Sequence, residues 1–419
     1  MRKTQLVLAL AAVGFAGSAF ATNGYFAHGY GMSSKGMGGV GIAYAQDTLA
    51  AASNPAGMVY VGNRMDIGVD IFVPDRGFTY GGGSLDGNGS GAMETWFPIP
   101  EFGYNRMIGS DMSVGVSVYG NGGMNTTYGD NDHPFNFFPY GAADPNGDGI
   151  IDGTPTTVGI DLMQLFIAPT VAYKVNPQLS IGASLNLVAE SFSSKGLTAF
   201  GQPNNGKDYA YGVGVRLGAM YQVNNAVTLG ATYQTKTNMS KLKDYAAMFP
   251  NGGDFDIPAT YGVGIAVKAN DKVDVALDLV RIDYAGVDVT GNSALYSLFA
   301  TNQHGFGWKD QNVIKLGVAY KHSNDLTLRA GINYGKQPIN VATVFNANDI
   351  TSDLNTLAPG VVETHLTLGF TKSLSADSSI TGAYMHAFNK KVDGFGDFLG
   401  PSTLEMSQDS FGLSYNKKF

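Results

Sequence analysis

One acidic stretch has the residue types and spacing of a calcium-binding loop. Asp144, Asn146 and Asp148 stand at positions 1, 3 and 5, a glycine follows at position 6, and Asp152 stands at position 9. Calcium loops place carboxylate and amide oxygens at these positions, with a glycine at position 6 for the sharp turn. Pro155 occupies position 12, where such loops carry a bidentate glutamate. The stretch therefore predicts either a Ca²⁺ site or an acidic, turn-rich loop without a metal.

Three cations stand where they could bind the carboxylate head group of a ligand. Arg216, Lys315 and Arg329 lie in segments that alternate between apolar and polar residues, and each has a leucine as a direct neighbour. Successive side chains of a strand point to opposite faces, so the leucines and the cations meet different surroundings. A carboxylate can form charge-assisted hydrogen bonds with such cations. The alternative partners are the carboxylates predicted on the same face, Asp66, Asp70, Asp274 and Asp278.

Large apolar side chains gather in two stretches that read as loops. The first stretch contains Phe135, Phe137, Phe138 and Tyr140, and the second contains Leu295, Leu298 and Phe299. Exposed apolar clusters are unfavourable in water unless they contact something apolar. The two clusters could line a groove for a hydrophobic ligand, or they could pack against one another and order the loops.

Nothing in the sequence predicts a catalytic centre. There is no Gly-x-Ser-x-Gly nucleophile motif and no phosphate-binding Gly-x-x-x-x-Gly-Lys-[Ser/Thr] run. The six histidines are scattered, and His365 and His386 fall on different faces of their predicted strands. We expect a protein that is not an enzyme, uses no ATP and requires no cofactor.

The elements that carry these residues are predicted to be β-strands. Every second residue of 211–221, 227–233 and 326–334 is apolar, and most of the others are small or polar. From about residue 64 onward the pattern repeats, with short breaks near residues 109, 176, 224, 270, 323 and 376. Long breaks cover roughly 74–94, 121–157, 191–208, 238–254, 286–309, 336–360 and 389–404. Seven long loops and six short turns connect 14 antiparallel strands, as in bacterial outer-membrane barrels, whereas a soluble β-sandwich does not sort its loops by length.

Aromatic residues stand where the two lipid–water boundaries of a barrel would lie. Tyrosines precede both kinds of break: Tyr173, Tyr221 and Tyr320 before short turns, and Tyr233, Tyr284 and Tyr334 before long loops. Girdles of aromatic side chains flank the apolar band of outer-membrane barrels. The chain ends on Phe419, and a final strand that ends in an aromatic residue resembles the signal read by the bacterial barrel-assembly machinery.

The composition fits an exported barrel. The chain has no cysteine, 57 glycines and only 14% charged residues, against about a quarter in typical soluble proteins. A barrel wall in lipid needs few charges, and glycine tolerates strongly curved strands. The net charge of −8 argues against nucleic acid as a partner.

Residues 1–21 are predicted to be a signal peptide. Arg2 and Lys3 precede an apolar stretch over 6–16, and a small-x-small cleavage site ends at Ala21. The apolar stretch is shorter than the ~20 residues that a spanning helix needs. The alternative is a retained N-terminal anchor.

Residues 22–63 do not follow the strand pattern, although they are rich in glycine and alanine and contain bulky side chains such as Tyr25 and Phe26. The segment is too short to form a domain with its own core, and a wide barrel without a plug would be an open, watery tube. We therefore expect residues 22–63 to fold into the barrel as a hatch and residues 64–419 to form the barrel. A disordered leader is the alternative.

In this segment the sequence resembles the FadL/TodX-type outer-membrane transporters of fatty acids and aromatic hydrocarbons. The matching residues are 29–43, Asp47, 50–52 and the turn formed by Asn54, Pro55 and Ala56. The stretch 119–127 at the top of the third strand is also similar, and it contains Gly120, Asn121, Gly122 and Gly123. With the 14 strands and the terminal phenylalanine, the resemblance covers the whole mature chain.

The resemblance implies an all-β, 14-stranded antiparallel transmembrane β-barrel plugged by an N-terminal hatch, multi-pass in the bacterial outer membrane. It implies an apolar pocket near the hatch, an outer groove between long loops, and a kink in the third strand at 120–123 that opens a side exit. The alternative for these glycines is that they only begin the long loop. We assign gating to the hatch, and in particular to Asn54, Pro55, Ala56, Tyr25 and Phe26.

We expect a channel for passive, diffusion-driven uptake of hydrophobic small molecules, such as long-chain fatty acids, through a series of apolar sites. The alternatives are a channel for monoaromatic hydrocarbons, a general porin or an adhesin barrel. The expected partners are the hydrophobic substrate, outer-membrane lipid and lipopolysaccharide, and the barrel-assembly machinery during biogenesis.

Overall fold

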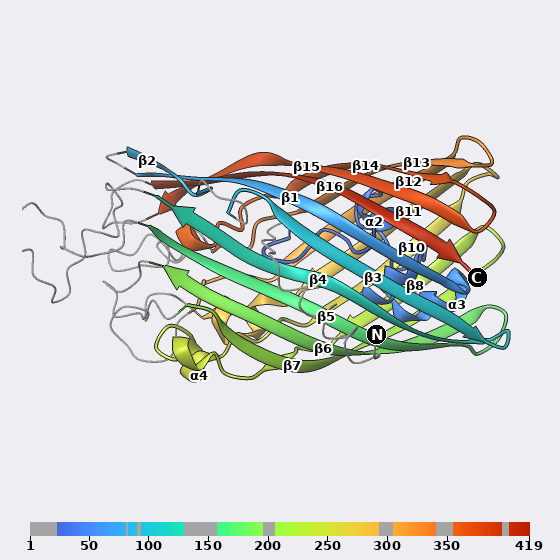
Figure 1. The fold of residues 1–419 in the computed structure, drawn as a ribbon, viewed down its shortest axis with the longest axis horizontal. Coiled ribbons are helices and arrows are strands. Elements are labelled where there is room, and N and C mark those ends of the chain that lie inside the picture. The colour runs from blue at the N-terminus through green and yellow to red at the C-terminus, as the bar shows by residue number, and fades with distance from the viewer. Residues whose placement is uncertain are drawn as a thin grey trace, which may run out of the picture.

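The computed structural model describes residues 23–80, 83–89, 94–129, 157–195, 206–292, 305–340, 355–395 and 402–419. Within these ranges sixteen strands form one antiparallel sheet, and two of them, β2 (Gly83–Asp86) and β9 (Asn238–Met239), are short additions to β1 and β7. The other fourteen close into a barrel because the first, β1, pairs with the last, β16, from Arg64↔Lys418 to Thr79↔Thr403 (Figure 1). Closure leaves no exposed sheet edge, as a lipid environment requires.

The barrel strands follow one another around the wall in chain order. They are β1 (Arg64–Tyr80), β3 (Phe97–Ile108), β4 (Met112–Tyr128), β5 (Val158–Lys174), β6 (Leu179–Lys195), β7 (Asp208–Gln222), β8 (Val227–Gln234), β10 (Thr260–Lys268), β11 (Val273–Ile282), β12 (Gln311–Lys321), β13 (Leu326–Gly335), β14 (Thr364–Ser373), β15 (Ser378–Phe395) and β16 (Ser402–Lys418). The predicted 14-stranded antiparallel barrel is thus confirmed.

All six predicted short turns join neighbouring strands at one end of the barrel, the end at which β16 finishes in Figure 1. The strand ends on the opposite side were predicted less well. β1 continues to Tyr80, and β4 continues to Tyr128, so both strands run well into the stretches expected to be loops. Each has 17 residues, whereas about 9 to 11 suffice to cross a bilayer. The period-two pattern fades above the lipid because both faces there are polar or covered, although the hydrogen-bonded ladder continues.

The alternation of the strands separates a lipid face from a lumen face. Leu217, Leu316 and Leu328 are exposed on the outside, as expected from their positions. The tyrosines at the barrel ends are also exposed, apart from Tyr284, which was expected in the outer girdle. Tyr284 begins the short 3₁₀-helix η6 (Tyr284–Gly286) after β11 has ended, so its side chain turns inward and is fully buried.

The N-terminal segment lies inside the barrel, where Figure 1 draws it in blue. It contains four short helices: α2 (Met32–Lys35), η1 (Thr48–Ala52), η2 (Pro55–Gly57) and α3 (Met58–Val61). The side chains of Asp47 and Asn54 cap η1 and η2 by accepting hydrogen bonds from the N–H groups of Leu49 and Ala56. In the part of the chain that the structure describes, no helix is long and apolar enough to cross a membrane.

The many glycines of the hatch allow backbones to approach closely. Gly39 has a φ of 80°, and a Cβ at this position would come within 1.8 Å of the carbonyl oxygen of His28. A Cβ on Gly38, with a φ of 72°, would come within 2.7 Å of the Leu316 carbonyl oxygen in the wall. Only glycine combines this backbone conformation with this contact distance. The hatch is therefore packed directly against the wall.

Candidate functional site

The four carboxylates predicted on the inner face, Asp66, Asp70, Asp274 and Asp278, all bond from the barrel wall to the hatch. Asp278 accepts hydrogen bonds from the N–H groups of Gly41 and Ile42 at 2.7 and 3.0 Å. Asp274 accepts one from the hydroxyl of Tyr44 at 2.8 Å, and Asp70 forms an ion pair with Lys35 at 2.7 Å. These side chains belong to the face on which the alternation placed them, and their partners are in the hatch.

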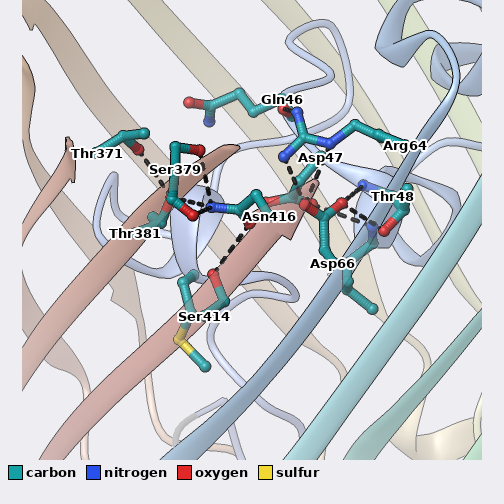
Figure 2. A network of polar contacts seen from close by, with 12 residues as sticks. Gln46, Asp47, Thr48, Arg64, Asp66, Thr371, Ser379, Thr381, Ser414 and Asn416 are labelled. Atoms are coloured by element: carbon teal, nitrogen blue, oxygen red, sulfur yellow. Dashed lines mark hydrogen bonds and ion pairs between the residues drawn. The ribbon is translucent and has the colours of Figure 1, made fainter. Parts of the chain in front are cut away.

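The fourth carboxylate, Asp66, also bonds to the hatch. Its Oδ2 accepts hydrogen bonds from the N–H and hydroxyl groups of Thr48 at 2.8 and 2.6 Å. Arg64 pairs with Asp66 at 2.5 Å and also donates to the carbonyl oxygen of Gln46 at 3.0 Å. Figure 2 shows Asp66 between Arg64 and Thr48, with Asn416 in a separate polar cluster on the neighbouring wall. The first strand of the barrel is thus tied directly to the hatch at residues 46–48.

Burial shifts the pKa values of several hatch side chains, among them Asp47 and His28. Burial raises the pKa of Asp47 to about 6, and the charge of Asp66 adds to this rise. Burial lowers the pKa of His28 to about 3, and His365 and Lys35 lower it further. His28 is therefore neutral near pH 7, and its ring stacks on that of His365 at a centroid distance of 6.2 Å.

The three predicted head-group cations all point inward and all donate hydrogen bonds to the hatch. Lys315 donates to the carbonyl oxygens of His28 and Gly39 at 2.9 and 3.3 Å. Arg216 donates to the carbonyl oxygen of Ser53 at 3.4 Å. Arg329 donates to the side chain of Gln46 at 2.8 Å. Among the described residues, none of the three has a carboxylate within 4 Å as an ion-pair partner.

Two of these cations share a cavity. Arg216 and Lys315 line a space of about 50 Å³ between hatch and wall, together with Phe26, Ala27 and Tyr30. The Nε of Arg216 is buried without a hydrogen-bond partner in the described part of the chain. Arg329 does not line this cavity. The structure therefore brings two of the three cations together beside apolar hatch residues.

The third barrel strand, β4, carries an irregularity at the predicted kink. Its register with β5 shifts between Gly120 and Gly122, so Asn121 is an extra residue in the ladder. The side chain of Asn121 lies inside, where it donates to Gln164 at 3.1 Å and accepts from the hydroxyl of Tyr30 at 2.8 Å. The glycines therefore lie within a strand, and they do not begin a loop.

Next to this bulge the ladder between β3 and β4 stops. The two strands pair from Ile108↔Met112 only as far as Phe102↔Val118. Beyond this point β3 contains Pro98 and Pro100, and proline has no N–H to donate. The N–H of Met107 donates toward β1, to Asn63, so by alternation the two prolines stand at positions whose N–H groups would face β4. This part of the wall has no ladder to close it.

The first residues of the hatch bond to β4 at this gap. Phe26 forms a β-bridge with Gly122. The N–H of Ala27 donates to the carbonyl oxygen of Asn121 at 2.9 Å, and that of Gly123 donates to the carbonyl oxygen of Tyr25 at 3.1 Å. A Cβ on Gly122 would come within 2.1 Å of this Tyr25 oxygen. Two of the residues assigned to gating, Tyr25 and Phe26, thus lie directly against the bulge.

The other assigned hatch residues lie farther along the chain. Asn54, Pro55 and Ala56 are fully buried at the turn into η2. Asn54 donates to the carbonyl oxygens of Ile42 and Ala219 at 2.7 and 3.1 Å. This turn therefore fastens the hatch to β7, three strands along the wall from β4.

Above the hatch the lumen is packed with apolar side chains. Buried aromatic residues from the wall and from the long connections form one cluster with Tyr25, namely Phe192, Tyr245, Phe249, Phe255, Tyr284, Phe306 and Trp308. A cavity of about 10 Å³ beside Tyr25 and Trp308 is too small for a ligand. Pockets for small molecules are typically about 300 to 1,000 Å³. Among the described residues, the space beside Tyr25 is therefore closed to a ligand.

Several predicted residues lie outside the described ranges. They are the loop aromatics Phe135, Phe137, Phe138 and Tyr140, the second cluster Leu295, Leu298 and Phe299, and the calcium candidates Asp144, Asn146, Asp148 and Asp152. The signal peptide, 1–21, also lies outside them. Within the described ranges, no group of histidine or carboxylate side chains could hold a metal ion.

Sequence reasoning missed the residues that shape the gap and the aromatic interior. The Phe97-Pro98-Ile99-Pro100 run was a usable signal, because prolines inside a strand indicate an edge without ladder partners. Tyr284 and Trp308 gave no such signal, since they come from connections whose path depends on the folded barrel.

The sequence profile of the outer membrane protein transport proteins (OMPP1/FadL/TodX) matches residues 8–393. The chain belongs to this family. It is an outer-membrane channel of the FadL/TodX type for hydrophobic substrates, as the hatch, the barrel and the apolar lumen indicated. No curated protein matches the chain.

Solved structures of FadL/TodX-type proteins have the same fold. The toluene transporter TodX of Pseudomonas putida is 21% identical, with a TM-score of 0.67 over 94% of this chain and 99% of that one. The toluene transporter TbuX of Ralstonia pickettii is 20% identical, with a TM-score of 0.65 over 94% and 99%. A FadL homologue of Pseudomonas aeruginosa is 17% identical, with a TM-score of 0.67 over 94% and 100%. At these identities the likeness concerns the fold alone.

Proposed function

We propose that this chain takes up hydrophobic small molecules by passive diffusion and releases them sideways, through the wall between β3 and β4. The observation that carries the proposal is the gap beyond Phe102↔Val118, where the hatch residues Tyr25 to Ala27 bond to β4. A hydrophobic molecule that leaves here enters lipid without crossing the periplasmic end of the barrel, which the hatch fills. No step in this path needs energy input or a catalytic residue.

The energetics suit a series of shallow apolar sites. Each Å² of apolar surface kept from water contributes about 25 cal/mol, and release requires that no single site bind too tightly. The buried aromatic residues above the hatch supply such surfaces. Movement of the first hatch residues would then join them to the gap, because those residues lie between the lumen and β4.

Long-chain fatty acids are the first candidate substrate. The cavity beside the hatch combines apolar side chains with Arg216 and Lys315, and a carboxylate could accept hydrogen bonds from both. Neither cation has an ion-pair partner within 4 Å among the described residues, although the carboxylate of Asp278 also lines this cavity.

Monoaromatic molecules are the second candidate. Tyr25 lies among Phe26, Tyr284 and Trp308, an arrangement that holds one aromatic ring. Two of the similar structures, TodX and TbuX, are toluene transporters.

Outer-membrane lipid would contact the exposed apolar belt, and lipopolysaccharide the outer end of the long strands. Phe419 is exposed at the end of β16, where the barrel-assembly machinery could read it during biogenesis.

Uptake of labelled oleate and toluene tests the proposal. A transporter-deficient bacterial strain expressing this chain should accumulate at least one of the two faster than the empty strain. In planar bilayers the purified protein should carry no steady ionic current, because the lumen is filled. A large, steady conductance without hydrophobic uptake would show a general porin instead.

A further inference from the structure

Tyr25 of the hatch occupies a box of aromatic rings. Its ring centroid lies 5.0 Å from that of Phe26, 5.5 Å from Tyr284, 6.1 Å from Trp308 and 6.2 Å from Phe255. These are the separations at which aromatic rings attract one another. Tyr25 is fully buried, so the box encloses it on all sides.

One end of this box is polar, although the surroundings are apolar. Gln164 and Glu190 are buried there, from the paired strands β5 and β6. The Nε2 of Gln164 donates to Oε2 of Glu190 at 2.8 Å, and its Oε1 accepts from Asn121 at 3.1 Å. The other oxygen of Glu190, Oε1, has no hydrogen-bond donor in the described part of the chain. No lysine or arginine of these ranges pairs with this carboxyl group either.

A buried carboxyl oxygen without a donor has lost its bonds to water without replacement, which is unfavourable. The oxygen is therefore available to a donor that enters the lumen.

Tyr25 lies next to this polar pair, because it packs against Gly122, the β4 partner of Gln164. Burial and the neighbouring Tyr284 raise the pKa of Tyr25 well above its usual value, Glu190 raises it further, and Gln164 opposes the rise. The hydroxyl has no hydrogen-bond partner among the described residues. Its main chain is fixed on both sides, because the Tyr25 N–H donates to the hydroxyl of Tyr284 at 3.1 Å and its carbonyl accepts from Gly123.

We propose that this box is a binding site for hydroxylated aromatic molecules, whose ring takes the place of the Tyr25 ring and whose hydroxyl group bonds to Glu190 and Gln164. A phenol donates one hydrogen bond and accepts another. It can donate to Oε1 of Glu190 and accept from the second N–H of the Gln164 amide. A hydrocarbon of the same shape leaves both groups unsatisfied, and a carboxylate meets a second carboxyl group.

This inference rests on the proposed uptake of hydrophobic molecules and names a class of cargo within it. Sites built to bond a hydroxyl group discriminate strongly against analogues that lack it, because the buried polar groups of the site then stay unpaired. One hydrogen bond gained in this way corresponds to a preference of about ten-fold.

Fluorescence of Trp308 can measure binding directly. The chain has two tryptophans, so Trp96→Phe leaves Trp308 as the only reporter, 6.1 Å from the ring of Tyr25. The full-length Trp96→Phe protein, held in amphipol, is titrated with 4-propylphenol and with propylbenzene. We expect the phenol to bind about ten-fold more tightly than the hydrocarbon.

Two substitutions on this background separate the site from general hydrophobic binding. Glu190→Leu should reduce the preference to about one while propylbenzene still binds, which also shows that the variant is folded. Glu190→Gln keeps an acceptor oxygen and should retain most of the preference.

Equal affinities in the Trp96→Phe protein, or an undiminished preference in Glu190→Leu, would overturn the inference and leave hydrophobic uptake intact. If neither compound binds, the proposed uptake of monoaromatic molecules fails together with this site.

Discussion

At the scale of single residues, alternation along the strands predicted which side chains point into the lumen, but it did not predict which residues they contact there. It placed Arg216, Lys315 and Arg329 in the lumen, and all three reach the hatch. Only Arg216 and Lys315 share a cavity. The path of the hatch across the lumen decides this, because Arg329 meets a different part of the hatch, at Gln46. Glu190 and Gln164 were missed, since nothing in a sequence marks a polar pair that becomes buried among aromatic residues.

The cavity beside the hatch makes a prediction about one cation. Lys315→Met should weaken oleate binding about ten-fold, because a charge-assisted hydrogen bond is lost, and should leave toluene binding unchanged. Arg329→Met is the matched control, since this cation lies outside the cavity. Binding of radiolabelled ligand to the purified variants measures both effects. An equal loss of oleate binding in the two variants would contradict the role of the cavity.

The acidic loop makes a prediction about a metal. If 144–152 binds Ca²⁺, calorimetric titration of the purified protein should show heat of binding that disappears in Asp148→Ala. Removing one of the few carboxylate ligands of such a loop lowers affinity strongly. Identical heats in the parent protein and the variant would end the proposal.

At the scale of elements, period-two patterns and turn residues predicted the strands and all six short turns. They did not predict that β1 and β4 extend far above the membrane, since a ladder continues wherever backbones can pair. Nor could they predict where pairing between β3 and β4 stops. That point lies next to the bulge at Asn121, and the bulge is defined only by the register of β4 against β5.

The docking of the hatch element depends on the buried pair between Lys35 and Asp70. Asp70→Ala should destabilise hatch docking by about 3 kcal/mol, the low end for breaking a buried ion pair, because Glu101 remains 3.9 Å from Lys35. Hydrogen exchange of the amides in 31–42 should then accelerate about 100-fold. Asp75→Ala, an exposed carboxylate of the same strand, should leave it unchanged. Unchanged exchange in Asp70→Ala would mean that other contacts hold the hatch.

At the scale of the whole molecule, the described strands close into a barrel by pairing in chain order, and pairing between β3 and β4 stops beside the bulge of β4. The hatch fills the end with short turns, and aromatic side chains fill the lumen above it. A filled barrel whose wall is unpaired between β3 and β4 explains how hydrophobic molecules could pass while ions do not. The fold class, the strand number, the hatch and the kink at 120–123 were predictable from the sequence and its resemblance, whereas the point at which pairing between β3 and β4 stops is seen only in the paired wall.

Deletion of Asn121 tests this account most directly. Removing the extra residue should let β4 run in register with β5 and stay beside β3, so that the gap between β3 and β4 closes. Cells carrying the deletion should lose uptake of labelled oleate and toluene, although the barrel still assembles and keeps its heat-dependent gel mobility. Uptake at the undeleted rate by such an assembled barrel would contradict passage through the wall.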